Sequence, residues 1–454
     1  MKTTSYIIIG CAFILSSCGL YKDYQPQQID TKGLIREDLN ADTTSSIASL
    51  KWEELFTDPN LQSLIREGLE HNSDLAVAKL NIDEAMASLG SAKGALMPTV
   101  DVAGSGNLSS YDGNKTTKTY SLGPEASWQI DVFGKLTNAK KAAAATVEER
   151  QAYAQAVRTQ LIAAIAEYYY TLETLDAKVK VTQQTVESWT EYVGTQKALM
   201  KAGQATSSDV SQAEASKLSA ETTLQQLYQQ ISQTENSLCA LIGRTSDNVT
   251  RGNLDEVKMP EKLAAGVPVD MLAARPDVRQ AEASLKSAFY NVNKARAAFY
   301  PSLTLSGSAG WTNSGGVGVT NPGALLLQAA GSLVQPILAN GQNKANLEIA
   351  KAQQEEARIK FRQTVLDAGN EVNNALQSYQ TSVNTIKLEN QQIDKLKQTL
   401  GDTEAQMKYG SVNYLQVIVT RQSLLSAQLS KLSDRYSEID SYIVLYQALG
   451  GGVK

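Results

Sequence analysis

Residues 200–209 read MKAGQATSSD and residues 407–416 read MKYGSVNYLQ, so a Met-Lys-x-Gly turn occurs twice in the chain. A shift of 207 residues aligns the two turns and also pairs Val210 with Val417. Repetition at a fixed period is the pattern of a duplicated structural unit. The 454-residue chain is therefore predicted to contain two homologous halves with the same order of elements.

A long proline-free stretch precedes each turn, at about 139–200 in the first half and about 343–407 in the second. From Leu161 to Val193 the apolar residues step alternately by four and three positions, which is the seam of a coiled coil. Shorter helical patterns lie before the hairpins and after the turns, at about 74–97, 209–243, 276–300 and 415–449. The chain is predicted to be mainly α-helical.

Two segments, about 99–132 and about 302–337, alternate apolar and polar residues around a polar, glycine-bearing turn. This period of two predicts a two-faced β-hairpin in each half. Strands of about ten residues are long enough to cross a bilayer when tilted. Four strands cannot close a barrel, and open edges are not tolerated in lipid, so several chains must share one barrel with a polar, water-filled interior.

The N-terminal residues read MKTTSYIIIGCAFILSSC. Their apolar run of about ten residues rises only about 15 Å as a helix, half the thickness of a hydrocarbon core. We interpret residues 1–17 as a cleaved secretory signal. The end of this stretch resembles the lipobox of bacterial lipoproteins, which implies acylation of Cys18 and stable anchoring by several acyl chains.

Three stretches carry a wider resemblance: WEELFTDPNLQSLIREGLEHNSDLAVA (52–78), RPDVRQAEASLKSAFYNVNKARAAFYPSLTLSGSAG (275–310) and LYQALGGG (445–452). With the duplication, the mature chain resembles the TolC-type outer-membrane efflux proteins, in their lipoprotein branch. The resemblance implies a homotrimer with a shared twelve-stranded outer-membrane barrel, a periplasmic α-barrel of long coiled-coil helices and an equatorial belt. It also implies a periplasmic adaptor and an inner-membrane resistance-nodulation-division transporter as partners, with outer-membrane lipid around the barrel.

In that family a leucine ring and an aspartate ring narrow the channel at the periplasmic helix tips. Leu415 matches the leucine, whereas Val419 stands at the aspartate position, so an apolar constriction that gates by dewetting is expected. Asp209 matches an acidic position of the first tip. It either attracts cations inside the channel or caps the helix that follows Ser207 and Ser208, and the sequence leaves both interpretations open.

The tip turns themselves require glycine, because Gly203 and Gly410 permit a tight reversal of the chain. Lys201 and Lys408 flank these glycines and are candidates for contact with the adaptor. Four aromatic residues of the hairpins are candidates for a girdle at the membrane–water boundary: Trp128, Trp311, Tyr111 and Tyr120.

The composition excludes other classes of function. A net charge of −5 without a basic stripe argues against nucleic acid as a partner. A single histidine, His71, leaves no basis for a multi-histidine metal site, and the sequence shows no catalytic constellation. We therefore expect no enzyme activity and no cofactor other than the lipid on Cys18.

The predicted function is the exit duct of a tripartite efflux pump for drugs or other small molecules. Two alternatives remain at this stage: the outer-membrane duct of a type I protein secretion system, and a membrane-anchored structural coiled coil. The predicted organisation comprises a signal (1–17), an anchor and equatorial segment (18–54), repeat 1 (55–243), an equatorial linker (244–273), repeat 2 (274–450) and a tail (451–454).

Overall fold

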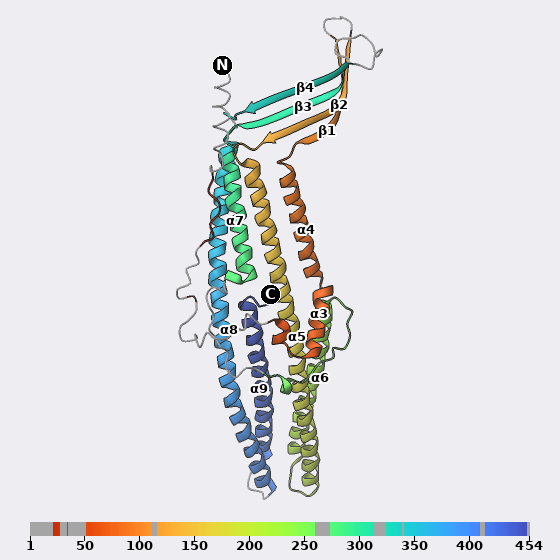
Figure 1. Cartoon of the computed structure of the whole chain (residues 1–454). Coiled ribbons are helices and arrows are strands. Elements are labelled where there is room, and N and C mark those ends of the chain that lie inside the picture. The colour runs from red at the N-terminus through yellow and green to blue at the C-terminus, as the bar shows by residue number, and fades with distance from the viewer. Residues whose placement is uncertain are drawn as a thin grey trace. The chain divides into compact units, whose positions relative to one another are not determined.

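The computed structural model describes residues 21–27, 34, 51–110, 116–258, 273–312, 324–337, 340–408 and 414–451. The signal, Cys18, Tyr111, Gly410 and most of the segments 18–54 and 259–272 lie outside these residues. Figure 1 shows the elements, whose bounds are α2 Trp52–Leu55, α3 Pro59–His71, α4 Ser73–Gly94, β1 Thr99–Ser109, β2 Thr117–Ile130, α5 Lys135–Lys201, α6 Ser207–Ile242, η3 Leu254–Glu256, α7 Pro276–Ala297, β3 Ser302–Thr312, β4 Ala324–Val334, α8 Gln342–Lys408 and α9 Tyr414–Ala448.

The chain divides into two compact units. The sheet unit takes its described residues from Met1–Ile29, Lys79–Tyr153 and Arg279–Thr364, and the helical unit takes its own from Asp30–Ala78, Ala154–Val278 and Val365–Lys454. None of the helices that the structure describes combines the length and the apolar content needed to cross a membrane.

Strands β1 to β4 form an antiparallel sheet in chain order. Its register places like residues opposite one another: Val100 faces Ala126 and Trp128 faces Leu305, whereas Asp101 faces Glu125. Directly opposed residues lie on the same face of a sheet. The sheet therefore has one apolar and one polar face, as the alternation in the sequence predicts.

The fourth strand was the least regular in sequence, yet β4 pairs with β3 along its whole length, from Ser302 opposite Val334 to Thr312 opposite Ala324. Large apolar side chains of the apolar face are exposed in the single chain, including Val102, Leu108, Leu327 and Leu333. A face of this kind requires an apolar environment.

The helices before the two hairpins are shorter than predicted. They end at Gly94 and Ala297, three residues before the predicted ends at 97 and 300. Their last turns tighten into i→i+3 hydrogen bonds, such as Met97 N to Gly94 O at 2.8 Å, because a residue that precedes proline disfavours the α conformation.

Helix α3 was not predicted from the sequence. Its start has a recognisable signal, because Asp58 accepts a hydrogen bond from the Asn60 amide at 2.7 Å and Pro59 occupies the first turn. An Asp-Pro pair before an apolar period is therefore a sequence signal for the start of this helix.

In the helical unit the predicted seam of α5 is largely buried. Leu161, Ile165, Leu172, Thr182 and Trp189 are all less than 5% exposed. Tyr168 departs from the seam, with 36% of its surface exposed.

Candidate functional site

The first tip of the helical unit is closed by a tight turn between α5 and α6. Gly203 adopts a φ of 71°, the left-handed conformation that the sequence predicts for it. Lys201 is exposed at the last position of α5. Lys408 ends α8 at the second tip, where Gly410 falls outside the described residues.

Asp209 is committed to hydrogen bonds within the first tip. Its carboxylate accepts from the Thr206 amide at 2.7 Å, and its own amide donates to the Thr206 hydroxyl at 3.3 Å, which forms a capping box. The Thr206 amide, together with the hydroxyls of Thr206 and Tyr414, lowers the pKa of Asp209. The geometry therefore favours the capping interpretation, and the contact with Tyr414 joins α6 to α9.

An apolar cluster, here called the tip cluster, packs the two helix pairs together. It comprises Trp189, Tyr192, Val193, Ala213, Ala220, Val417 and Ile418, all buried. Trp189 and Tyr192 meet edge to face with ring centroids 5.8 Å apart. The Tyr192 hydroxyl donates to the Tyr414 carbonyl at 3.4 Å, so α5 and α9 are also joined by a hydrogen bond.

Arg421 of α9 lies against this cluster and contacts two other helices. Its guanidinium forms an ion pair with Glu404 of α8 and donates to the Ser188 hydroxyl of α5. The same group lies 5.1 Å from the ring centroid of Tyr192 and 5.7 Å from that of Trp189. These are cation–π distances, so one side chain holds α9 to both α8 and α5.

The duplication relates this ion pair to a second one. A shift of 207 residues maps Glu404 and Arg421 onto Lys197 and Glu214, which form an ion pair at 2.7 Å. The two halves therefore keep the same inter-helix pairing with the charges exchanged. The first pair is exposed (51% and 44%), whereas Arg421 is only 13% exposed, so the two pairs differ in strength.

The predicted constriction residues occupy one face of α9. Leu415 and Val419 are 49% and 52% exposed, one helical turn apart, whereas Val417 and Ile418 between them are buried in the tip cluster. The structure thus brings Leu415 and Val419 together on a surface that the tip cluster does not cover.

The aromatic candidates lie at two levels of the sheet. Trp128 faces Leu305 on β3, and Trp311 faces Leu122 six residues before Trp128, a separation of about 20 Å along the strand. Trp128 also donates to the Leu96 carbonyl at 3.0 Å, and Tyr120 of β2 is half-buried. Two levels on one apolar sheet are compatible with the two boundaries of a membrane.

In the part of the chain that the structure describes, no three His, Cys, Asp or Glu side chains converge as ligands of a metal ion. Side chains at the tips join segments of four helices and leave an apolar face exposed.

A family model described as "Outer membrane efflux protein" matches this chain twice, at residues 64–244 and 267–451. The chain belongs to the outer membrane efflux protein family. Two matches in tandem agree with a duplicated chain, and the second begins within the segment predicted as a linker (244–273). The protein is thus an outer-membrane efflux channel, and its family comprises ducts rather than enzymes.

Individual relatives match over nearly their whole length. The probable efflux pump outer membrane protein TtgC of Pseudomonas putida is 31% identical, with 97% of this chain and 94% of TtgC covered. The cation efflux system protein CusC of Escherichia coli K12 is 28% identical, with 97% and 98% covered. The open-state structure of the Neisseria gonorrhoeae MtrE outer membrane channel is 29% identical, with a TM-score of 0.83 and coverage of 96% and 98%.

Arg421 was not among the site residues predicted from the sequence. The alignment of the two halves contains a signal for Arg421. A shift of 207 residues pairs Lys197 with Glu404 and Glu214 with Arg421, so the charge is reversed at both positions. The contacts of Arg421 with Trp189 and Tyr192 have no such signal, since they join the two halves.

Proposed function

We propose that three copies of this chain form the exit duct of a tripartite efflux pump. The sheet is the observation that supports this most directly: β1 and β4 are its edges, and neither has a further strand partner in the described residues. Unpaired edges are costly in lipid, and three copies supply twelve strands that close them. Mass measurement of the detergent-solubilised protein tests the trimer, and a monomer or dimer as the stable membrane form refutes it.

The polar face lines the duct and the apolar face meets lipid, with Trp128 and Trp311 near its two boundaries. Acylation of Cys18 adds an anchor. A periplasmic adaptor docks on the helix tips beside Lys201 and Lys408, and an inner-membrane resistance-nodulation-division transporter supplies the cargo. The relatives support such an assembly, because TtgC is named as the outer membrane protein of an efflux pump and CusC as a protein of a cation efflux system.

In this proposal the duct is narrowest at the tips, where Leu415 and Val419 of the three copies converge. Apolar rings restrict flow by excluding water. Planar-bilayer recordings of the purified protein test this directly, with Leu415→Ala and Val419→Ala as variants and Leu388→Ala, an exposed leucine about 30 Å from the end of α8, as control. We expect a larger conductance from the two tip variants alone, and no conductance from any form refutes the duct.

A further inference from the structure

A cavity of about 500 Å³ lies in the helical unit, away from the tips. It is enclosed by the chain before α3, the segment 252–258 and one face each of α5 and α9. Exposed residues of the segment, such as Asn253 and Glu256, also line it, so it is reachable from solvent. Its volume is within the range of pockets that bind small molecules.

One wall of the cavity carries a buried acid without a partner. Glu173 of α5 is 2% exposed, and neither of its carboxylate oxygens accepts a hydrogen bond from any described residue. The Tyr169 hydroxyl and the Gly252 amide lie close enough to lower the pKa of Glu173. By hydrogen-bond geometry, however, the hydroxyl donates to Asp58 at 2.5 Å and the amide donates to the Tyr169 hydroxyl at 2.8 Å. Burying an acid in this way is costly unless a cation or a proton neutralises it.

Asp58 makes the charge imbalance larger. A Cβ built on Gly252 would lie 2.8 Å from an oxygen of Asp58 and 2.9 Å from an oxygen of Glu173, so the two carboxylates flank the same backbone position. Burial, and next the charge of Asp58, raise the pKa of Glu173 to about 7. The cavity is therefore lined by three acids, Asp58, Glu173 and Glu256, against one cation, Lys258. Lys258 is exposed and forms no ion pair with these acids in the described residues.

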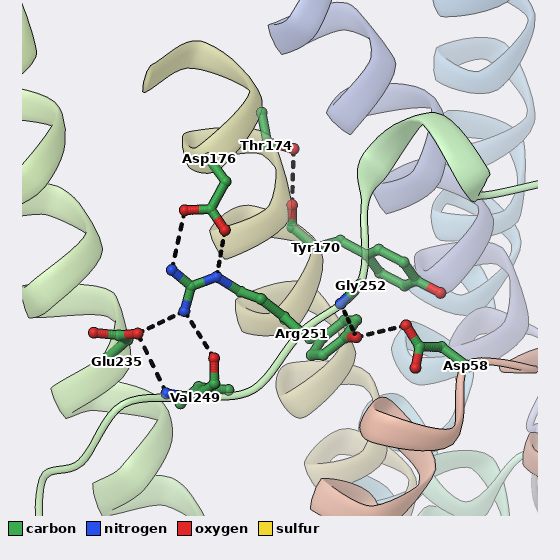
Figure 2. Close-up of polar contacts among 9 residues, drawn as sticks. Asp58, Tyr170, Thr174, Asp176, Glu235, Val249, Arg251 and Gly252 are labelled. Atoms are coloured by element: carbon green, nitrogen blue, oxygen red, sulfur yellow. Dashed lines mark hydrogen bonds and ion pairs between the residues drawn. The ribbon is translucent and has the colours of Figure 1, made fainter. Parts of the chain in front are cut away.

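The nearby guanidinium groups do not neutralise the acids of the cavity. Figure 2 shows Arg251, adjacent to Gly252, directed toward Asp176 and Glu235, with N–O distances of 2.5 Å to each. Arg435 of α9 is bound to Glu438 and to the Val257 carbonyl. Arg251 thus neutralises Asp176 and Glu235, whereas neither Asp58 nor Glu173 has an ion pair within the part of the chain that the structure describes.

The remaining walls define the shape of a suitable cation. The lining also includes aromatic and aliphatic surface, from Tyr170, Tyr442, Ile439 and Ile443. A hydrated metal ion makes poor use of such walls, whereas an ammonium group with an apolar body suits both the acids and the apolar surface. A primary ammonium also brings three N–H donors, enough for both oxygens of Glu173 and one of Asp58.

We propose that this cavity is a binding site for small organic ammonium cations, with Glu173 and Asp58 as the charged recognition groups. Isothermal titration calorimetry of the solubilised full-length protein at about pH 8 tests it, with benzylammonium as probe and benzyl alcohol as its neutral counterpart. We expect saturable binding of benzylammonium and none of benzyl alcohol.

Two variants test whether Glu173 binds the ammonium group. Glu173→Gln keeps the shape of the side chain and should weaken binding of benzylammonium by about tenfold or more, because it removes a charge-assisted contact. Glu256→Gln, an acid at the exposed side of the same cavity, is the matched control and should leave the affinity within about twofold. Circular dichroism and oligomer mass confirm that each variant is folded.

Three results would overturn the proposal. The first is an absence of saturable binding to the wild type, and the second is equal affinity in Glu173→Gln. The third is binding that appears only after Lys258→Met, because Lys258 lines the cavity and would then be its natural cation.

Discussion

Replacing Arg421 by alanine removes the side chain that joins α9 to α8 and α5. The change deletes an ion pair with Glu404, a hydrogen bond to Ser188 and cation–π contacts with Trp189 and Tyr192. Charge-assisted hydrogen bonds contribute about 1.5–3 kcal/mol and partly buried cation–π contacts about 1 kcal/mol. Because Glu404 is 35% exposed and regains water, we expect a net loss of about 2–4 kcal/mol for the packed tip.

This energy corresponds to a shift of about 30- to 900-fold in the equilibrium between packed and separated tips. Single-channel recording in planar bilayers measures it as the fraction of time spent in high-conductance states. We expect Arg421→Ala to increase that fraction strongly. A double-mutant cycle with Glu404→Ala should give a coupling energy of about 1.5–3 kcal/mol, since the two side chains share one interaction.

The duplication provides a matched control. Lys197→Ala breaks the corresponding pair in the first half, which is exposed and should contribute less than about 1 kcal/mol. If Lys197→Ala and Arg421→Ala raise conductance equally, the contacts with Trp189 and Tyr192 are not what holds the tips. If a folded Arg421→Ala trimer conducts like the wild type, Arg421 does not hold the tips together and the prediction is wrong.

Three further outcomes are expected. Cys18→Ser should abolish incorporation of radioactive palmitate, and equal labelling would rule out the lipid anchor. Glu173 has a raised pKa of about 7 against 4.5, so the folded chain holds a proton that the unfolded chain releases. The free energy of unfolding of the chain should therefore fall by up to about 3 kcal/mol as the pH rises from about 5 to about 8. Thermal unfolding measures this pH dependence, which should be weaker in Glu173→Gln. A Cβ built on Gly123 would overlap the Ala309 carbonyl oxygen, whereas one on Gly106 meets nothing closer than 3.9 Å. Gly123→Ala should therefore reduce the yield of trimer seen by native electrophoresis, and Gly106→Ala should not; equal yields would contradict the close approach of β2 and β3.

The strands could be predicted because their signal is local. Alternation at a period of two needs only neighbouring residues, and it placed Val100, Leu122 and Trp128 on one face. The duplication then supported the weaker fourth strand, since β4 occupies the position that the first hairpin assigns to it. The helix ends before Pro98 and Pro301 were predicted three residues too late, because proline marks where a helix must stop but does not show how many residues the tight last turn occupies.

A residue of the site could be predicted only where its place in a turn or a motif is enough to identify it. Gly203 followed from the turn, whereas the constriction at Leu415, inferred from a resemblance at one motif, stays a prediction. The role of Asp209 depended on its partners, Thr206 and Tyr414, and the second of these lies on another helix. The sequence also could not predict that Arg251 would form no ion pair with Glu173, because a sequence does not show where Arg251 directs its guanidinium.

The exchanged ion pairs explain how a duplicated chain obtains two unlike tips. In the first half the acid is on the second helix of the pair, and Glu214 of α6 forms its ion pair with Lys197 of α5 at the surface. In the second half the exchange places the arginine on α9, where a planar guanidinium both pairs with Glu404 and lies over Trp189 and Tyr192. A lysine or an acid at position 421 could not stack in the same way. Arg421 therefore adds a charged attachment of the second helix pair to the first, beside the Tyr192–Tyr414 hydrogen bond and the apolar packing of the tip cluster. All of these contacts fix α9 from one side and leave exposed the face that carries Leu415 and Val419.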